Sequence, residues 1–177
     1  MKIGELCNRD IVSVAAGTPL SEVARLMCER HVGSVVVTTA LADGLLAIGM
    51  ITDRDITRAQ LRLGGDLSRL ASEDVMTREP LTLSEDESLE TALARLRARG
   101  VRRAPVTTPR GLLAGLVSID DVVGQLAREL AGLARLLHLQ PVRERSGSDA
   151  AGLTIVADNV VPLRYSPPDG CGRYSEE

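Results

Sequence analysis

Apolar residues recur along the chain at two spacings, one typical of helices and one typical of strands. Two sets of four apolar residues follow the i, i+3, i+4, i+7 spacing, which places a single apolar stripe on one face of a helix. They are Leu20, Val23, Ala24 and Met27 and, 69 residues later, Leu89, Ala92, Leu93 and Leu96. The pattern therefore predicts two equivalent amphipathic helices.

Short runs of β-branched and aliphatic residues surround each of these helices and predict strands. In chain order they are 11–14, 35–38 and 45–51 around the first helix, and 81–83, 104–107 and 112–117 around the second. A further helix is predicted after each group, from residue 53 to about 63 and from 119 to about 139. Neither unit is long enough to bury much core alone. We predict an α/β (α+β) fold in which two βαββα repeats pack as a pseudo-symmetric pair.

Direct comparison of the two halves supports the repeat. Residues 6–38 align with residues 75–107 with six identities in 33 positions, and the apolar pattern agrees better than the identities do. Beyond that point the offset falls from 69 to 66, because the turn around 42–44 is three residues longer in the first repeat. We therefore divide the chain into repeat 1 at 1–66, repeat 2 at 67–140 and a C-terminal extension at 141–177. Within this extension, 153–156 is a candidate strand.

The starts of the two stripe helices carry their own signals. Thr18 followed by Pro19 fits an N-cap with proline at the first helical position. The acidic run 85–87 stands at the corresponding place in repeat 2, where negative charge favours a helix N-terminus. We expect the helices to begin at these points.

The part of the repeats that agrees best in residue type is a motif of Gly, two apolar residues, Thr or Ser, two variable residues and Asp. It occurs as GMITDRD at 49–55 and as GLVSIDD at 115–121. The motif is typical of a strand that turns into a helix, where Gly permits close backbone approach and helix-opening N–H groups point outward. A hydroxyl beside free N–H groups suits a phosphate, and a carboxylate accepts hydrogen bonds from a ribose diol. The alternative is an ordinary Ser/Thr N-cap with an acid in the first turn. We favour it less, because the motif occurs at equivalent places in both repeats.

These features together resemble a tandem pair of CBS domains, a Bateman module, over about residues 1–138. The resemblance rests on the βαββα repeat, on the two motifs, and on VMTREP at 75–80 and RRAPV at 102–106. Members of this family bind adenine nucleotides or related adenosyl ligands in clefts between the repeats. The resemblance implies two ribose ligands, Asp55 and Asp121, and two phosphate-side donors, Thr52 and Ser118.

The resemblance also implies what lines the adenine. Residues 8–12, beginning with Asn8, and residues 77–81, beginning with Thr77, would form that wall. The chain has no Phe or Trp, so aliphatic side chains must supply the slot. The expected slot residues are Ile11, Val12, Pro80 and Leu81.

Positive charge is concentrated in repeat 2. Six arginines and no acidic residue lie in 91–119. Arg102 and Arg103 stand where the family often carries His-Arg, just before a predicted strand at the cleft, and guanidinium groups suit bidentate phosphate contact. Repeat 1 has Gly-Ser at 33–34 instead, so we expect the two clefts to differ in affinity. Two further arginines are interpreted as a solvated helix face: Arg95 and Arg99.

Composition excludes several function classes. With 21 basic and 24 acidic side chains the net charge is −3, which argues against a dedicated nucleic-acid-binding protein. No apolar run approaches the ~18 residues needed to span a bilayer, and the N-terminus does not resemble a signal peptide. Three cysteines without framework spacing favour a reduced, cytoplasmic location. We predict neither a nucleic-acid partner nor a membrane partner.

Motifs for catalysis or metal binding are weak. The chain has no Walker sequence, no nucleophile elbow and no His-Glu-x-x-His, so we predict no catalytic residues and no enzyme. Cys28 and His31 have metal-like spacing, but a zinc site needs two more ligands. Cys7 aligns with Met76, an apolar repeat position, which favours a buried thiol. We predict no metal and no obligatory cofactor.

The sequence therefore favours a non-catalytic regulatory or energy-sensing protein. Its ligand would be AMP, ADP or ATP, with NAD and S-adenosylmethionine left open, and its regulated target would be a separate protein. Two rivals are a structural dimerisation module with vestigial clefts and a zinc-responsive regulator. A homodimer through helical faces is expected, because the last predicted helix carries a broad apolar stripe that one small module does not cover. The stripe residues are Val122, Val123, Leu126, Leu130, Leu133 and Leu137.

Overall fold

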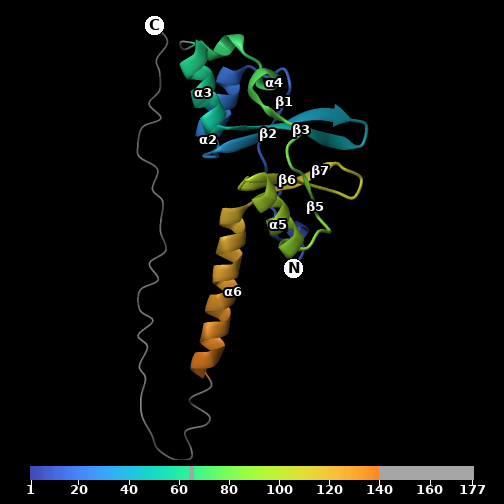
Figure 1. Cartoon of the computed structure of the whole chain (residues 1–177), viewed down its shortest axis with the longest axis vertical. Helices are drawn as coiled ribbons and strands as arrows, with labels where there is room; N and C mark the ends of the chain where they lie inside the picture. The colour runs from blue at the N-terminus through green and yellow to red at the C-terminus, as the bar shows by residue number, and fades with distance from the viewer. Residues whose placement is uncertain (64–65, 140–177) are drawn as a thin grey trace, which may run out of the picture. The chain divides into compact units, whose positions relative to one another are not determined.

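Two β-sheets form the frame of the chain in a computed structural model, which describes residues 1–63 and 66–139 (Figure 1). The first sheet has the strand order β1-β2-β3-β4 and the second has the order β5-β6-β7. The strands of the first sheet are β1 (Ser13–Ala15), β2 (Ser34–Leu41), β3 (Gly44–Thr52) and β4 (Thr77–Arg78). Those of the second are β5 (Leu83–Ser84), β6 (Arg103–Thr107) and β7 (Leu113–Ser118). The predicted α/β fold with two repeats is confirmed.

The strand pairing follows from the order of elements in each repeat. A helix connects β1 to β2 and β5 to β6, and both of these pairs are parallel. A tight turn connects β2 to β3 and β6 to β7, and both of these pairs are antiparallel. This is the expected outcome, because a helical crossover returns the chain in the same direction and a hairpin reverses it.

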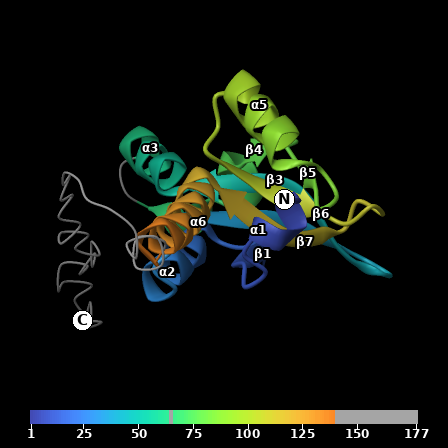
Figure 2. The same cartoon turned by 90° about the horizontal axis from the view of Figure 1, so that it is seen from below.

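Four helices form at the predicted places, and two short helices and a 3-10 turn were not predicted. They are α1 (Ile3–Leu6), α2 (Leu20–Glu29), α3 (Asp53–Leu63), the 3-10 turn η1 (Leu67–Arg69), α4 (Ser72–Val75), α5 (Leu89–Arg99) and α6 (Ile119–Leu139). Helices α2 and α3 pack on the first sheet, and Figure 2 shows the same elements from below. Residues Met1–Arg128 form one unit, and the remaining described residues of α6, 129–139, belong to a second. The candidate strand at 153–156 and the rest of 141–177 lie outside the described residues.

The N-terminal segment packs into the core of the second repeat. Ile3 is fully buried in the same apolar cluster as Leu83 and Leu96. Asn8 and Leu116 exchange two backbone hydrogen bonds, at 2.8 and 2.9 Å, so the segment also pairs with β7. The first residues of repeat 1 therefore belong structurally to repeat 2.

The start of repeat 2 makes the reciprocal crossing into the first core. The N–H of Ser72 donates to the carbonyl of Thr18 at 2.8 Å, and its buried hydroxyl donates to the carbonyl of Ala16 at 2.6 Å. Met76 packs against the first core, and β4 then pairs with β3. We call residues 2–8 and 71–78 the crossing segments. Because of them, the sequence repeats at 1–66 and 67–140 do not coincide with the two packed cores.

Gly49 and Gly115, which open the two motifs, lie where the crossing segments pass over the sheets. A Cβ atom at Gly115 would be 2.7 Å from the Cys7 sulfur and 2.9 Å from the Asn8 carbonyl oxygen. A Cβ atom at Gly49 would overlap the sulfur of Met76. The expectation of close approach at both glycines is confirmed, and its cause is the crossing.

The cap prediction for the first stripe helix is wrong. Helix α2 begins at Leu20, with Pro19 as its N-cap residue and no side-chain cap. Pro19 is extended, with ψ of 137°, and forms a bridge with Ala71. The carbonyl of Thr18 accepts from the crossing segment, so this stretch is held in an extended conformation to meet that segment rather than to open a helix.

The second stripe helix begins after the acidic run 85–87, not on it. Ser88 is the N-cap of α5, and its hydroxyl oxygen accepts from the N–H of Thr91 at 3.2 Å. The carboxylate of Glu87 instead accepts from the N–H of Ser84 and pairs with Arg95 at 2.8 Å. This acid therefore ties α5 to β5.

No helix within the described residues is long and apolar enough to cross a membrane. The longest, α6, has 21 residues but carries charged residues from its first turn onward. The expectation of no membrane-spanning helix therefore holds for the part of the chain that the structure describes.

Substitution of Gly115 tests the crossing. Gly115→Ala should lower the free energy of unfolding by about 1–3 kcal/mol, because the added methyl group presses on the Asn8 carbonyl, which is held by the pairing with β7. Urea denaturation measures the effect.

Gly124→Ala is the matched control inside α6. Its Cβ atom would meet only the guanidinium end of Arg128, at 3.7 Å. Because alanine is the better helix former, this variant should gain up to about 1 kcal/mol. Equal losses in the two variants would contradict the close approach at Gly115.

Candidate ligand-binding site

A hollow of about 630 Å³ opens where the β3–α3 junction, the segment after β4 and the turn before β6 meet. We call it the Thr52 hollow. Its volume falls within the roughly 300–1,000 Å³ typical of small-molecule sites. Its lining residues are Met50, Thr52, Asp53, Arg54, Thr77, Arg78, Glu79, Pro80, Leu81, Arg99, Gly100, Val101, Arg102 and Arg103.

Thr52 and Asp55 are held together at the start of α3. One carboxylate oxygen of Asp55, Oδ2, accepts from the Thr52 hydroxyl at 2.7 Å and from the Thr52 N–H at 2.9 Å. The other oxygen, Oδ1, has no hydrogen-bond partner among the described residues. The pair therefore fixes the first turn of α3 and leaves one carboxylate oxygen to accept from a ligand.

Ser118 and Asp121 repeat this geometry at the start of α6. Asp121 Oδ2 accepts from the Ser118 hydroxyl at 2.6 Å and from the Ser118 N–H at 3.0 Å, while the Asp121 N–H donates back to the hydroxyl oxygen at 3.1 Å. This reciprocal arrangement is a capping box. Ser118 and Asp121 therefore do cap the start of α6, as the alternative interpretation of the motifs expects.

Half of the predicted site residues gather at one place. Six of the twelve line the Thr52 hollow: Thr52, Thr77, Pro80, Leu81, Arg102 and Arg103. Asp55 is not a lining residue, but it directly follows Asp53 and Arg54, which line the hollow, and it accepts a hydrogen bond from Thr52. These residues come from both repeats, and the segment that follows β4 brings the two groups together.

Three of the other predicted residues, Asn8, Ser118 and Asp121, lie near the start of α6. Asn8 pairs with Leu116, two residues before Ser118, so the chain brings it beside the second motif. Asp121 lines a smaller hollow of about 240 Å³ together with Glu5. Ile11 and Val12 are half-buried just before β1, and Val12 packs against the first core.

The Thr52 hollow carries an excess of positive charge. Five arginines and two acidic residues, Asp53 and Glu79, line it. Arg102 forms an exposed ion pair with Asp120 at 3.0 Å. The guanidinium of Arg103 lies beside Gly33, where a Cβ atom would be only 3.3 Å from it. The small residue at 33 thus leaves room for a cation, which suits an anionic ligand group.

Arg99 is exposed on helix α5, as predicted, and it also lines the Thr52 hollow, which the prediction did not include. Helix α5 ends at Arg99, and Gly100 adopts a left-handed conformation with φ of 63° that turns the chain toward the hollow. The equivalent position in repeat 1 is also an arginine, Arg30, so the sequence did single out this position. Other lining residues that the sequence did not predict are Met50, Asp53, Arg54, Gly100 and Val101, whereas Arg78 and Glu79 lie within the predicted wall 77–81.

Glu79 is in an unusual backbone conformation at the rim of the hollow. Its φ is 48°, in the left-handed region that costs a non-glycine residue roughly 1–2 kcal/mol. Its N–H donates to the carbonyl of Ile48 at 3.3 Å, which keeps the segment after β4 close to β3. The strained turn therefore positions the wall that contains Pro80 and Leu81.

Metal ligands do not gather in the part of the chain that is described: no group of three or more His, Cys, Asp or Glu side chains there is placed to hold an ion. Cys28 and His31 are both exposed, and Cys171 lies outside the described residues. Cys7 is half-buried, and burial raises the pKa of its thiol above the ordinary value. The predicted buried thiol is therefore found only in part, since Cys7 packs against the second core without being fully buried.

Comparison with known proteins identifies relatives of residues 3–128. A family model described as CBS domain matches residues 3–62 and again residues 71–128. Protein MK0525 of Methanopyrus kandleri is 28% identical over 123 residues, which cover 70% of this chain and 61% of that protein. The chain thus spans less than two thirds of that relative.

Solved structures of other proteins have a similar fold. The CBS-domain-containing protein ATU1752 from Agrobacterium tumefaciens has a TM-score of 0.61 and 26% identity, covering 71% of this chain and 98% of that one. The CBS domain pair of protein MJ0100, in complex with 5-methylthioadenosine and S-adenosyl-L-methionine, has a TM-score of 0.62 and 17% identity. It covers 73% of this chain and 98% of that one, and at this identity it shows the fold alone.

Two substitutions of Glu79 separate backbone strain from charge. Glu79→Gly should raise the free energy of unfolding by up to about 1 kcal/mol, because glycine adopts the left-handed conformation without strain. Glu79→Gln keeps the strain and should leave stability unchanged. Urea denaturation of both variants decides the matter, and a Gly variant less stable than the Gln variant would contradict the strained turn.

Proposed function

The chain belongs to the CBS-domain family, and on that premise we propose that it is a non-catalytic regulatory module that binds an adenine nucleotide in the Thr52 hollow. The observation that carries the proposal is the meeting, in one hollow, of a cationic wall with an apolar one. The structural neighbour crystallised with two adenosyl compounds supports the ligand class.

The walls of the hollow fit the parts of a nucleotide. Arg102 and Arg103 would face the phosphates, because guanidinium groups form paired hydrogen bonds to phosphate oxygens. The adenine would lie against aliphatic side chains, among them Pro80 and Leu81. The ribose diol would donate to the open Oδ1 of Asp55. The positive excess favours phosphate-bearing ligands over S-adenosylmethionine, whose sulfonium is itself cationic.

The geometry changes the role expected for Thr52. Its hydroxyl hydrogen is already donated to Asp55, at 2.7 Å, so it is not available to a phosphate oxygen while that bond lasts. Thr52 therefore acts as a positioning residue that orients the Asp55 carboxylate. The phosphates would be bound chiefly by the arginines.

The second motif would form a weaker site. Asp121 lines a small hollow with two other acidic residues, Glu5 and Asp120, and one arginine, Arg128. Such a wall disfavours a polyphosphate because like charges repel. We therefore expect two classes of site, or one site only, with the Thr52 hollow the tighter.

The proposal includes a regulatory output. Because the hollow has walls from both repeats, a ligand that binds it can favour one relative arrangement of the repeats. The size of this shift is limited by the difference in the ligand's affinity for the two arrangements. We infer that the chain forms a homodimer through helical faces and acts on a separate protein. In this scheme AMP, ADP and ATP compete for the hollow, which would report energy state.

The rival function is a structural dimerisation module whose clefts bind nothing. Isothermal titration of the full chain with AMP, ADP, ATP, NAD and S-adenosylmethionine distinguishes the two. The proposal expects saturable binding of at least one phosphate-bearing ligand and a rise in melting temperature with it. No heat and no thermal shift with any of the five would favour the structural module.

Loss of the ribose carboxylate should weaken binding. Asp55→Ala is expected to cost about 1.5–3 kcal/mol of nucleotide affinity, the value for a hydrogen bond to a charged group. It also removes a helix cap, at about 1 kcal/mol of stability. Asp121→Ala is the matched control, since it removes the same cap from α6 while leaving the Thr52 hollow intact. Equal affinity losses in the two variants would contradict the assignment of the tighter site.

Removal of a phosphate contact should depend on salt. Arg103→Gln is expected to weaken ATP roughly 10–100-fold at low salt. The difference from the unmodified chain should shrink at about 1 M salt, where the Debye length falls to roughly 3 Å. Arg69→Gln is the control, because Arg69 is exposed, pairs with Asp66 and does not line the hollow. A salt-independent loss in the Arg103 variant would contradict direct phosphate contact.

A further inference from the structure

Helix α6 carries a row of apolar residues at alternating steps of four and three. The row, which we call the α6 seam, is Ile119, Val123, Leu126, Leu130, Leu133 and Leu137. The row repeats every seven residues, at 119, 126 and 133 and at 123, 130 and 137, so it supplies two apolar positions per heptad. A row at this spacing is the pattern by which two helices wind around each other with interlocking side chains.

The seam is open to solvent. From Val123 to Leu137 its members are between 40% and 68% exposed, and no described residue covers them. These fractions correspond to on the order of 500 Å² of exposed surface in each copy, more than half of the roughly 800 Å² that each partner buries in a standard stable interface. A row of this size calls for a partner.

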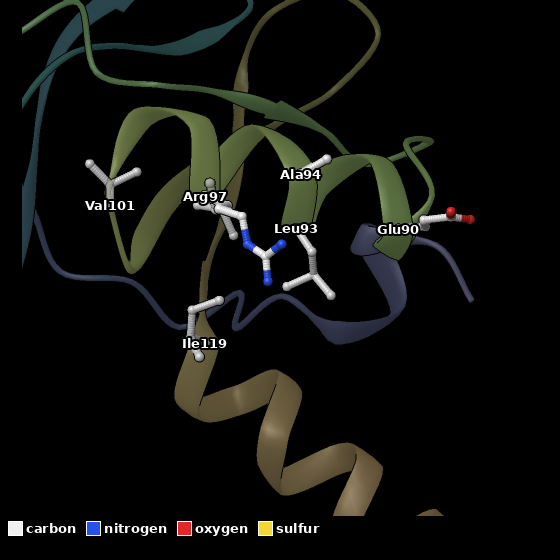
Figure 3. A pocket seen from close by; sticks show the side chains of 7 residues that line it. Glu90, Leu93, Ala94, Arg97, Val101 and Ile119 are labelled. Carbon is white, nitrogen blue, oxygen red and sulfur yellow. The ribbon is translucent and has the colours of Figure 1, made fainter.

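The first seam residue joins this row to a second apolar surface. Ile119 lines a groove of about 500 Å³ with Leu93 and Val101, beside α5 (Figure 3). Figure 3 shows Leu93 and Ile119 on facing elements at the point where α6 begins. The groove and the seam residues Ile119, Val123 and Leu126 therefore lie on the same unit, Met1–Arg128.

The residues beside the seam favour a second copy of the same chain. The positions that flank it between Val123 and Leu137 are Ala127, Glu129, Ala134 and Leu136. Only one of these is charged, so two identical seams would not bring rows of like charge together. The two alanines are small and allow close approach of the helices. A second copy also supplies a seam of identical length and spacing.

We propose that the α6 helices of two copies pair along the α6 seam as a two-stranded coiled coil. This inference rests on the homodimer proposed above and specifies its surface. It does not depend on nucleotide binding, so either proposal can fail while the other stands.

Sedimentation equilibrium of the full chain, over a range of protein concentrations, tests the pairing. The unmodified chain should have a mass of twice 18.9 kDa. The double variant Leu130→Glu, Leu133→Glu should raise the dissociation constant of the dimer by at least about 100-fold, because carboxylates would have to be buried in the seam. Both leucines are exposed, so the body should keep its melting profile.

Ala131→Glu is the matched control, since it adds the same side chain to α6 on a position outside the seam. It should remain dimeric with an unchanged dissociation constant. A seam variant that stays dimeric would overturn the coiled coil while leaving the homodimer in place. An unmodified chain that is monomeric at all concentrations would overturn both, and would make the chain's own residues 140–177 the candidate cover.

Discussion

The fold depends on one constraint: each sheet is completed by the opening segment of the other repeat. Ile3 is fully buried in the second core, and Ser72 is fully buried beside the first. Both crossings combine side-chain burial with backbone hydrogen bonds. The second core is therefore incomplete without residues 2–8, and the first is incomplete without residues 71–78. Gly49 and Gly115 follow from this constraint, since a larger residue at either position would push a crossing segment off its sheet.

The same crossing builds the candidate site. After β4 pairs with β3, the chain runs through Glu79 to Leu81 and becomes one wall of the Thr52 hollow. The opposite walls come from the start of α3 and from the turn before β6. The hydrogen bonds between Thr52 and Asp55 fix the first of these walls. The site is therefore a product of how the repeats exchange segments and not of either repeat alone.

The sequence predicts what depends on local spacing. The helices and strands follow from the periodicity of apolar residues, and the gathering of Thr52, Thr77 and Arg103 follows from the family resemblance. The crossings could not be predicted, because they join residues such as Thr18 with Ser72 and Asn8 with Leu116, 54 and 108 residues apart, through backbone pairing that leaves no periodic signal. Arg99 is exposed at the end of α5, as its helical pattern predicts, but that local pattern does not indicate that the end of α5 borders the hollow.

The central claim is that a nucleotide occupies the hollow between the crossing segment and the arginine turn. The most direct measurement is a crystal structure of the full chain with whichever of AMP, ADP, ATP, NAD and S-adenosylmethionine binds most tightly in titration. The account predicts ligand density in the Thr52 hollow, with the ribose at Asp55 and phosphate at Arg103. Density at the Ser118 motif alone, or phosphates directed away from the arginines, would contradict it.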